Sequence, residues 1–147
     1  MLASNIVRPD LKKPTLRDLR ATSTILLVDD DPTILALLKA ILIREGYNVV
    51  GAECPAIAIE ITRQITFDML ITDFQMPGMN GFEMARHLTK NRPALPVLLI
   101  SGAEPSELPL REIREKHWNF IPKPIDRELL LRTADYQSLG WAVRLRA

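Results

Sequence analysis

The sequence lacks most of what marks a disulfide-rich, membrane-spanning or strongly charged protein. Cys54 is the single cysteine among 147 residues, which excludes an internal disulfide and fits a reducing cytoplasm. No apolar stretch approaches the ~20 residues that a membrane-spanning helix requires, and the N-terminus lacks the apolar core of a signal peptide. The formal net charge of +1 gives no broad electrostatic case for binding nucleic acid or a membrane surface. We therefore expect a cytoplasmic protein that binds neither.

The rest of the composition is that of an ordinary globular domain. Hydrophobic residues make up 47% and charged residues 25%, and 147 residues are enough to bury a core in one domain. The first part of the chain differs, because it holds several lysines and arginines and two prolines. We interpret residues 1–23 as a mobile basic extension with a short helical turn at 15–20, residues 24–139 as the domain, and residues 140–147 as a short tail that extends or packs beside the last helix.

Short apolar runs alternate with stretches of helical periodicity from Thr24 onward. After Asp31, for example, Ile34, Leu38 and Leu42 recur at helical spacing until Gly46 ends the pattern. Repeated β–α units predict a doubly wound parallel sheet with helices on both faces. The strands of such a sheet are buried on both sides. The predicted strands are 24–28, 48–52, 69–72, 97–100 and 118–121, and the later helices are predicted at 55–64, 81–90, 110–116 and from 126.

Polar side chains follow the ends of four of the five apolar runs. In an open parallel sheet, ligands bind outside the carboxyl ends of the strands, so we expect these side chains to converge. Neighbouring carboxylates repel one another unless a cation lies among them, and Mg²⁺ prefers such oxygen ligands. The sequence therefore predicts a magnesium site beside an acceptor carboxylate, a hydroxyl and an ammonium. These side chains belong to Asp29, Asp30 and Asp31 after the first run, then to Asp73, Ser101 and Lys123.

Four motifs built on these residues resemble one known family. Residues 28–32 read VDDDP, 72–81 read TDFQMPGMNG, 100–103 read ISGA and 120–124 read FIPKP. Together, in this order and at this spacing, they resemble the CheY-like receiver domain of two-component response regulators over about residues 24–139. The resemblance implies a flavodoxin-like fold of five parallel strands in the order 2-1-3-4-5.

The resemblance also implies a metal-dependent phosphoacceptor. It assigns Asp73 as the carboxylate that takes the phosphoryl group. It places Mg²⁺, with Mn²⁺ as an alternative, on Asp30, Asp73 and the backbone carbonyl of Gln75, while Asp29 contacts the metal through water. Asp31 we interpret instead as the cap of the following helix, with Pro32 in its first turn.

Further positions of the family pattern concern the bound phosphoryl group. Lys123 and Ser101 are expected to contact it, and Ser101 is expected to couple to a switch residue, Phe120. A permanently buried core aromatic is the alternative interpretation of Phe120. The backbone positions that the resemblance assigns are a cis peptide bond between Lys123 and Pro124 and a loop shaped by Pro77, Gly78 and Gly81, where we expect fixed or positive φ.

The expected function is that of a phosphoacceptor receiver in a two-component or phosphorelay system. A sensor histidine kinase or a histidine phosphotransfer protein would donate the phosphoryl group, and an unidentified protein partner would respond to the conformational change. Such a chain is no enzyme beyond its own phosphorylation and dephosphorylation, and the family suggests a homodimer on phosphorylation. Two alternatives stay open: a phosphorylation-independent interaction module, and the receiver part of a hybrid kinase or larger regulator. An aspartyl-phosphate hydrolase of the haloacid dehalogenase type is disfavoured, because it needs an aspartate where Gln75 stands.

Overall fold

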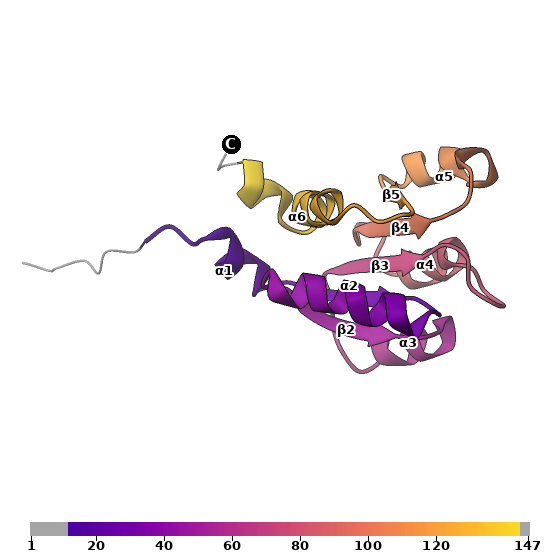
Figure 1. Cartoon of the computed structure of the whole chain (residues 1–147), viewed down its shortest axis with the longest axis horizontal. Coiled ribbons are helices and arrows are strands. Elements are labelled where there is room, and N and C mark those ends of the chain that lie inside the picture. Colours follow the sequence, from indigo (N-terminus) through magenta and orange to yellow (C-terminus); the bar gives the residue numbers. More distant parts are fainter. Residues whose placement is uncertain (1–11, 145–147) are drawn as a thin grey trace, which may run out of the picture.

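Five parallel strands lie in the order β2-β1-β3-β4-β5, which confirms the predicted topology (Figure 1). The computed structural model describes residues 12–144, and their side chains as far as residue 140. The sheet register pairs Val28 with Ala52 and with Thr72, so the carboxyl ends of the strands reach the same edge. The strands are β1 (Thr24–Val28), β2 (Asn48–Ala52), β3 (Met69–Asp73), β4 (Val97–Ser101) and β5 (Asn119–Pro122).

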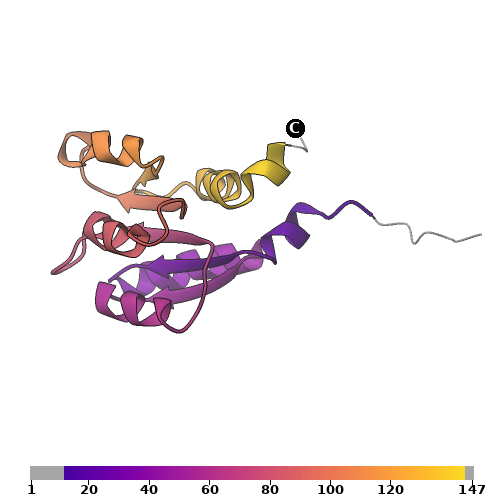
Figure 2. The same cartoon turned by 180° about the vertical axis from the view of Figure 1, so that it is seen from behind.

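Helices cover both faces of the sheet and divide the core into two apolar clusters. Successive residues of β1 alternate between them, since Leu26 faces one cluster and Leu27 the other, and both are fully buried. The helix α2 crosses in front of the sheet in Figure 1 and lies behind it in Figure 2. On the face of Leu27 lie α2 (Pro32–Arg44) and α6 (Arg127–Arg144); on the face of Leu26 lie α3 (Pro55–Thr62), α4 (Gly81–Thr89) and α5 (Leu110–Glu115).

The helix starts follow from side chains that satisfy the first free N–H groups. The carboxylate of Asp31 accepts hydrogen bonds from the backbone N–H groups of Thr33 and Ile34, which confirms its predicted role as a cap. A second cap, which was not predicted, starts α4, where Asn80 and Glu83 form a capping box. Before α5, Pro105 starts a 3-10 turn, Pro105–Glu107, and Pro109 directly precedes the helix.

Part of the N-terminal segment packs against the domain. The predicted helical turn is present as α1 (Leu16–Arg20), and it packs against α6 (Figure 1). Its last residue, Arg20, is buried and donates to both carboxylate oxygens of Asp135, at 2.9 and 2.7 Å. This buried ion pair joins the part from Thr15 to Ser23 to the domain, and the mobility expected of this segment stays a prediction. Residues 1–11 lie outside the described residues.

The Arg20–Asp135 pair belongs to a larger polar cluster. The hydroxyl of Tyr47 donates to Asp135 at 2.6 Å, and the guanidinium of Arg20 lies over the Tyr47 ring. Burial raises the pKa of the Tyr47 hydroxyl, so the phenol keeps the proton that it donates. Glu45 accepts from both Arg20 and Arg127. The cluster thereby joins α1, the α2–β2 turn and α6.

At the other terminus, the predicted tail continues α6. This helix runs to Arg144, with non-helical backbone angles at Leu139 that mark a kink. Residues 145–147 lie outside the described part, as do the side chains of residues 141–144. Among the described residues, no helix is both long enough and apolar enough to cross a membrane.

Candidate functional site

The predicted site residues come together at the carboxyl edge of the sheet. Asp29 and Asp30 follow β1, Asp73 is the last residue of β3, and Ser101 is the last residue of β4. Lys123 directly follows β5, and its backbone N–H donates to the Ser101 carbonyl at 2.8 Å. The parallel register therefore brings three carboxylates and a hydroxyl to the carboxyl ends of β1, β3 and β4. The ammonium of Lys123 joins them from the loop after β5.

The three carboxylates form a cluster that fits a cation. Oxygen atoms of Asp29, Asp30 and Asp73 all lie within 4.8 Å of one another. Asp29 is 1% exposed; its Oδ1 accepts from the backbone N–H of Asp31 at 2.9 Å, whereas its Oδ2 is buried with no partner among the described residues. A buried carboxylate oxygen without a donor is costly, and a hard divalent cation satisfies it. The donor set is thus suited to Mg²⁺.

The pKa shifts in the cluster also indicate a site that favours a cation. Burial raises the pKa of Asp29 above its usual range, against a hydrogen bond from Asp31 that lowers it, and the nearby Asp73 charge adds to the rise. Burial also raises the pKa of Asp73, which is 5% exposed, although Lys123 and the backbone N–H of Gln75 oppose the rise. The ionised forms of both carboxylates are therefore disfavoured, and an added positive charge would stabilise them.

Lys123 supplies a positive charge beside the expected acceptor. Its Nζ lies 3.3 Å from Oδ1 of Asp73, and its side chain is 34% exposed. The peptide bond between Lys123 and Pro124 is cis, as predicted. The ammonium can thus contact an anion bound at Asp73.

The hydroxyl of Ser101 is buried at the same edge. Ser101 is 1% exposed, and its Oγ accepts a hydrogen bond from the backbone N–H of Ala103 at 3.0 Å. Phe120 is half-buried and packs against the cluster on the α4 face of the sheet. It is neither a fully buried core residue nor an exposed ring, so its role as a switch stays a prediction.

The loop after Asp73 corrects one expectation and confirms another. Gly78 has a φ of 78°, as a tight turn requires, but Gly81 is not among the residues with positive φ. Gly81 is needed for space: a Cβ built on it would lie 2.0 Å from the carbonyl oxygen of Asp73. Its N–H also donates to the Phe74 carbonyl at 2.8 Å. Helix α4 therefore starts in direct contact with the backbone of Asp73, a relationship that the turn pattern around Pro77 did not reveal.

The Asn80–Glu83 capping box that starts α4 has a readable signature, an asparagine followed three residues later by a glutamate. The assignment of the Gln75 carbonyl as a metal ligand stays a prediction, as does the water-mediated contact of Asp29.

Comparisons with known proteins show which family the chain resembles. The family model of the response regulator receiver domain matches residues 25–135. Protein PilH of Pseudomonas aeruginosa is 35% identical over 111 residues, which cover 74% of this chain and 92% of PilH. The transcriptional regulatory protein GlrR of Escherichia coli is 32% identical over 111 residues, but this chain spans only 25% of its length. The structure of response regulator TrrA of Thermotoga maritima, in complex with Mg²⁺ and BeF, matches with a TM-score of 0.70 at 27% identity, covering 78% of this chain and 98% of TrrA.

Proposed function

The chain belongs to the response regulator receiver domain family, and on that premise we propose that Asp73 takes a phosphoryl group from a phosphohistidine in a Mg²⁺-dependent reaction. The observation that carries the proposal is the Asp29–Asp30–Asp73 cluster, with the buried, unpartnered Oδ2 of Asp29 and with Lys123 Nζ 3.3 Å from Asp73. A purely structural cluster of acids would explain neither the unpartnered Oδ2 of Asp29 nor the ammonium of Lys123 beside Asp73. That TrrA, of the same fold, was solved with Mg²⁺ and BeF supports the choice of metal.

The chemistry follows from the positions of the residues. A carboxylate oxygen of Asp73 attacks the phosphorus, an O–P bond forms, and the N–P bond of the donor breaks. The electron pair of that bond stays on the imidazole nitrogen, which leaves as neutral imidazole because the other ring nitrogen carries a proton. The product is an acyl phosphate on Asp73. Lys123 holds its ammonium where the phosphoryl oxygens gather and offsets their charge.

Asp30, Asp73 and the Gln75 carbonyl would hold the metal, with Asp29 reached through a bound water. When bound, Mg²⁺ offsets charge on the phosphoryl oxygens and orients the group toward the acceptor; Mn²⁺ has the same preference for oxygen ligands. The chain itself catalyses nothing beyond its own phosphorylation and dephosphorylation.

The signal that follows is a local rearrangement read by a protein partner. Ser101 Oγ uses a lone pair to accept from Ala103, which leaves its own proton free to donate to a phosphoryl oxygen. Movement of Ser101 opens space that the half-buried Phe120 ring can enter. The charge added at Asp73 thereby biases the packing of this ring. The donor is a sensor histidine kinase or a histidine phosphotransfer protein, whether the chain acts alone or as part of a longer regulator.

Phosphoramidate tests the proposal, because it carries the same N–P bond as phosphohistidine. With Mg²⁺ present, the chain should gain one phosphorus signal in ³¹P NMR that hydroxylamine removes, as it cleaves acyl phosphates. The Asp73→Asn variant should gain no such signal. A hydroxylamine-stable adduct, or an equal signal in Asp73→Asn, would place the phosphoryl group elsewhere and overturn the proposal.

A further inference from the structure

Positive charge gathers in a groove between α4 and the end of α5, away from the phosphoacceptor residues. Arg86 lies on α4, Lys90 directly follows that helix, and Lys116 lies in the turn after α5, beside His117. They surround a hollow of about 440 Å³ whose other lining residues include Thr89, Pro93 and Trp118. We call this the α4–α5 basic groove. It is a local feature, since the whole chain has a formal net charge of only +1.

The described side chains include no carboxylate in ion-pair contact with the cations of the groove. Among the residues that the structure describes, Arg86, Lys90 and Lys116 form no salt bridge. Two glutamates do border the area, but each has another partner: Glu83 caps α4 through Asn80, and Glu115 pairs with Arg111 at 3.0 Å. The three cations are therefore not neutralised by direct ion pairs, although Glu83 and Glu115 place negative charge at the borders of the groove.

Two of these cations are held in place by aromatic rings. The guanidinium of Arg86 lies over the Phe82 ring, 5.8 Å from its centroid, and Lys116 Nζ lies 5.2 Å from the centroid of Trp118. The two rings themselves pack edge to face, 5.6 Å apart. Cations held on a packed aromatic base lose less side-chain freedom on binding than free lysines do. The surface is thus preorganised for an anionic ligand.

From this arrangement we infer that the α4–α5 basic groove binds an acidic segment of another protein. A second hollow of about 450 Å³, lined by Met79, Glu83, Arg86, His87 and Lys90, lies next to the first and shares Arg86 and Lys90 with it. The shared cations form a ridge between two hollows, which suits an extended chain that crosses the ridge and places carboxylates on it. Apolar contacts in the hollows suit the side chains between those carboxylates.

Other anionic ligands fit the surface less well. A single phosphate or sulfate ion is far smaller than either hollow and would leave most of both unoccupied. A nucleic acid needs a longer track of cations for its regularly spaced phosphates, and Glu83 and Glu115 interrupt such a track at either side. A polypeptide can instead match a short cationic ridge with a few acidic residues.

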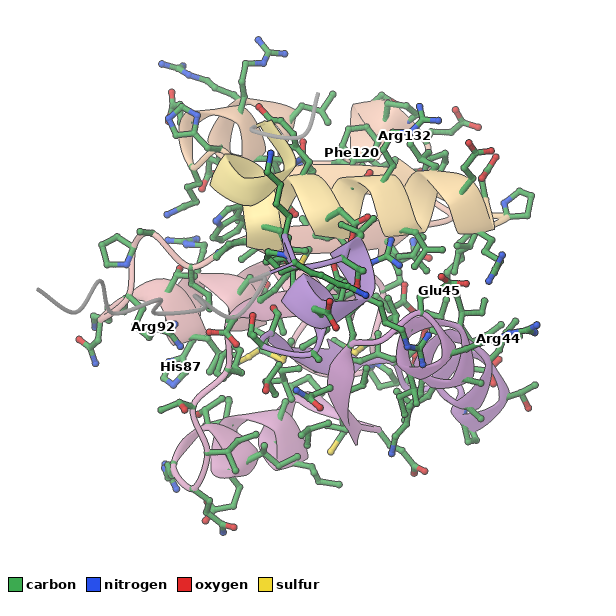
Figure 3. All side chains as sticks on the ribbon, turned by 90° about the vertical axis from the view of Figure 1, so that its left-hand side faces the viewer. Arg44, Glu45, His87, Arg92, Phe120 and Arg132 are labelled. Carbon is green, nitrogen blue, oxygen red and sulfur yellow. The ribbon has the colours of Figure 1, made fainter. Side chains whose placement is uncertain are left out.

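The inference does not depend on phosphorylation of Asp73, so the full-length, unphosphorylated chain serves for the test. The probe is a blocked 12-residue peptide in which glutamates alternate with leucine, alanine and glycine, titrated into ¹⁵N-labelled protein at low ionic strength. The groove variant is Arg86→Glu with Lys90→Glu. The control is Lys39→Glu with Arg44→Glu, which changes the net charge by the same amount on α2. Figure 3 shows Arg44 on the opposite flank of the molecule from His87, a groove-side residue.

We expect chemical-shift changes centred on the ends of α4 and α5 and on the Trp118 indole. The dissociation constant should rise by about tenfold or more in the groove variant and by less than about twofold in the control. The milder Arg86→Gln with Lys90→Gln pair, which keeps the chain close to neutral, should weaken binding in the same direction. A peptide with glutamine in place of glutamate should bind at least about tenfold more weakly, since the attraction is electrostatic.

Four results would overturn the inference. Equal weakening in the groove and control variants would show a response to net charge alone. Tighter binding of a 12-nucleotide oligothymidylate than of the acidic peptide would show a nucleic-acid surface. Saturation of the same shifts by millimolar inorganic phosphate would show a small-anion site. Absence of any peptide-dependent shift in folded wild type would show that the groove has no such ligand.

Discussion

Lys123 Nζ lies 3.3 Å from Oδ1 of Asp73, so the ammonium and the acceptor carboxylate are already in contact before any phosphoryl group arrives. One ammonium faces three carboxylates in this cluster. Burial is the main reason why the pKa of Asp73 stays raised despite Lys123, and the charge of Asp30 adds to the rise. The cluster is therefore built at a cost to the fold, and that cost can be measured.

The first prediction concerns stability and pH in metal-free protein. Because the folded-state pKa of Asp29 is raised, the folded chain holds its proton more tightly than the unfolded chain does, and ionisation as the pH rises removes stability. Asp29→Asn should thus gain stability relative to wild type as the pH rises from about 4 through the folded pKa. Each unit of pKa elevation corresponds to about 1.4 kcal/mol. Urea unfolding in EDTA between pH 4 and pH 8 measures this difference.

Glu60→Gln, on the exposed surface of α3, is the control and should show no such trend. Adding Mg²⁺ at ten times its dissociation constant should stabilise wild type by about 1.4 kcal/mol, and Asp29→Asn by less. A constant difference between Asp29→Asn and wild type across the pH range would contradict the account.

The second prediction concerns the contact between α4 and the acceptor. Gly81→Ala forces a methyl group against the Asp73 carbonyl oxygen, where the built Cβ lies at 2.0 Å, so α4 has to shift. We expect a loss of about 3 kcal/mol in the free energy of unfolding. Gly51→Ala is the matched control, because its Cβ would meet Leu35 at an ordinary 3.5 Å. Similar unfolding midpoints for the two variants in urea would refute a steric role of Gly81.

The third prediction concerns the anchor of the N-terminal helix. Arg20→Ala leaves the buried Asp135 carboxylate without its cation, and we expect a loss of about 3 kcal/mol in the free energy of unfolding. Arg63→Ala, which breaks the exposed pair with Glu60, should cost less than about 0.5 kcal/mol. If the double variant Arg20→Ala with Asp135→Ala proves as unstable as the sum of the single variants, the two residues are not coupled as the structure indicates.

The fourth prediction separates phosphorylation from signalling. Ser101→Ala should still accept a phosphoryl group, because Asp73 and Lys123 remain, but it lacks the hydroxyl that responds to that group. In wild type, NMR signals of the Phe120 ring should shift on phosphorylation; in Ser101→Ala they should shift far less. Assignment by Phe120→Leu identifies the ring. Equal chemical-shift changes in both proteins would show that Ser101 does not couple phosphorylation to Phe120.

Much of this architecture could be predicted from sequence because it depends on local patterns. Apolar runs placed the strands, and parallel order then brought Asp30, Asp73 and Lys123 to one edge, as the structure has them. The anchor of α1 could not be predicted in this way. Arg20 and Asp135 are separated by 115 positions, and nothing in the local sequence of either shows that they meet.

The turn after β3 shows a different limit. Its glycines were recognised as turn residues, but the sequence does not tell a glycine that needs positive φ, such as Gly78, from one that needs space, such as Gly81. That distinction depends on how closely α4 approaches the backbone of Asp73, which is a matter of tertiary packing.

The most direct test of the central claim is the intact mass of the chain after incubation with acetyl phosphate and Mg²⁺. Asp73→Asn, Asp30→Asn and an EDTA-treated sample are measured beside wild type. We predict one added phosphoryl group in wild type, none in Asp73→Asn, and little or none in Asp30→Asn or with EDTA. A single adduct that persists in Asp73→Asn, or one that forms equally well in EDTA, would contradict a metal-dependent acceptor at Asp73.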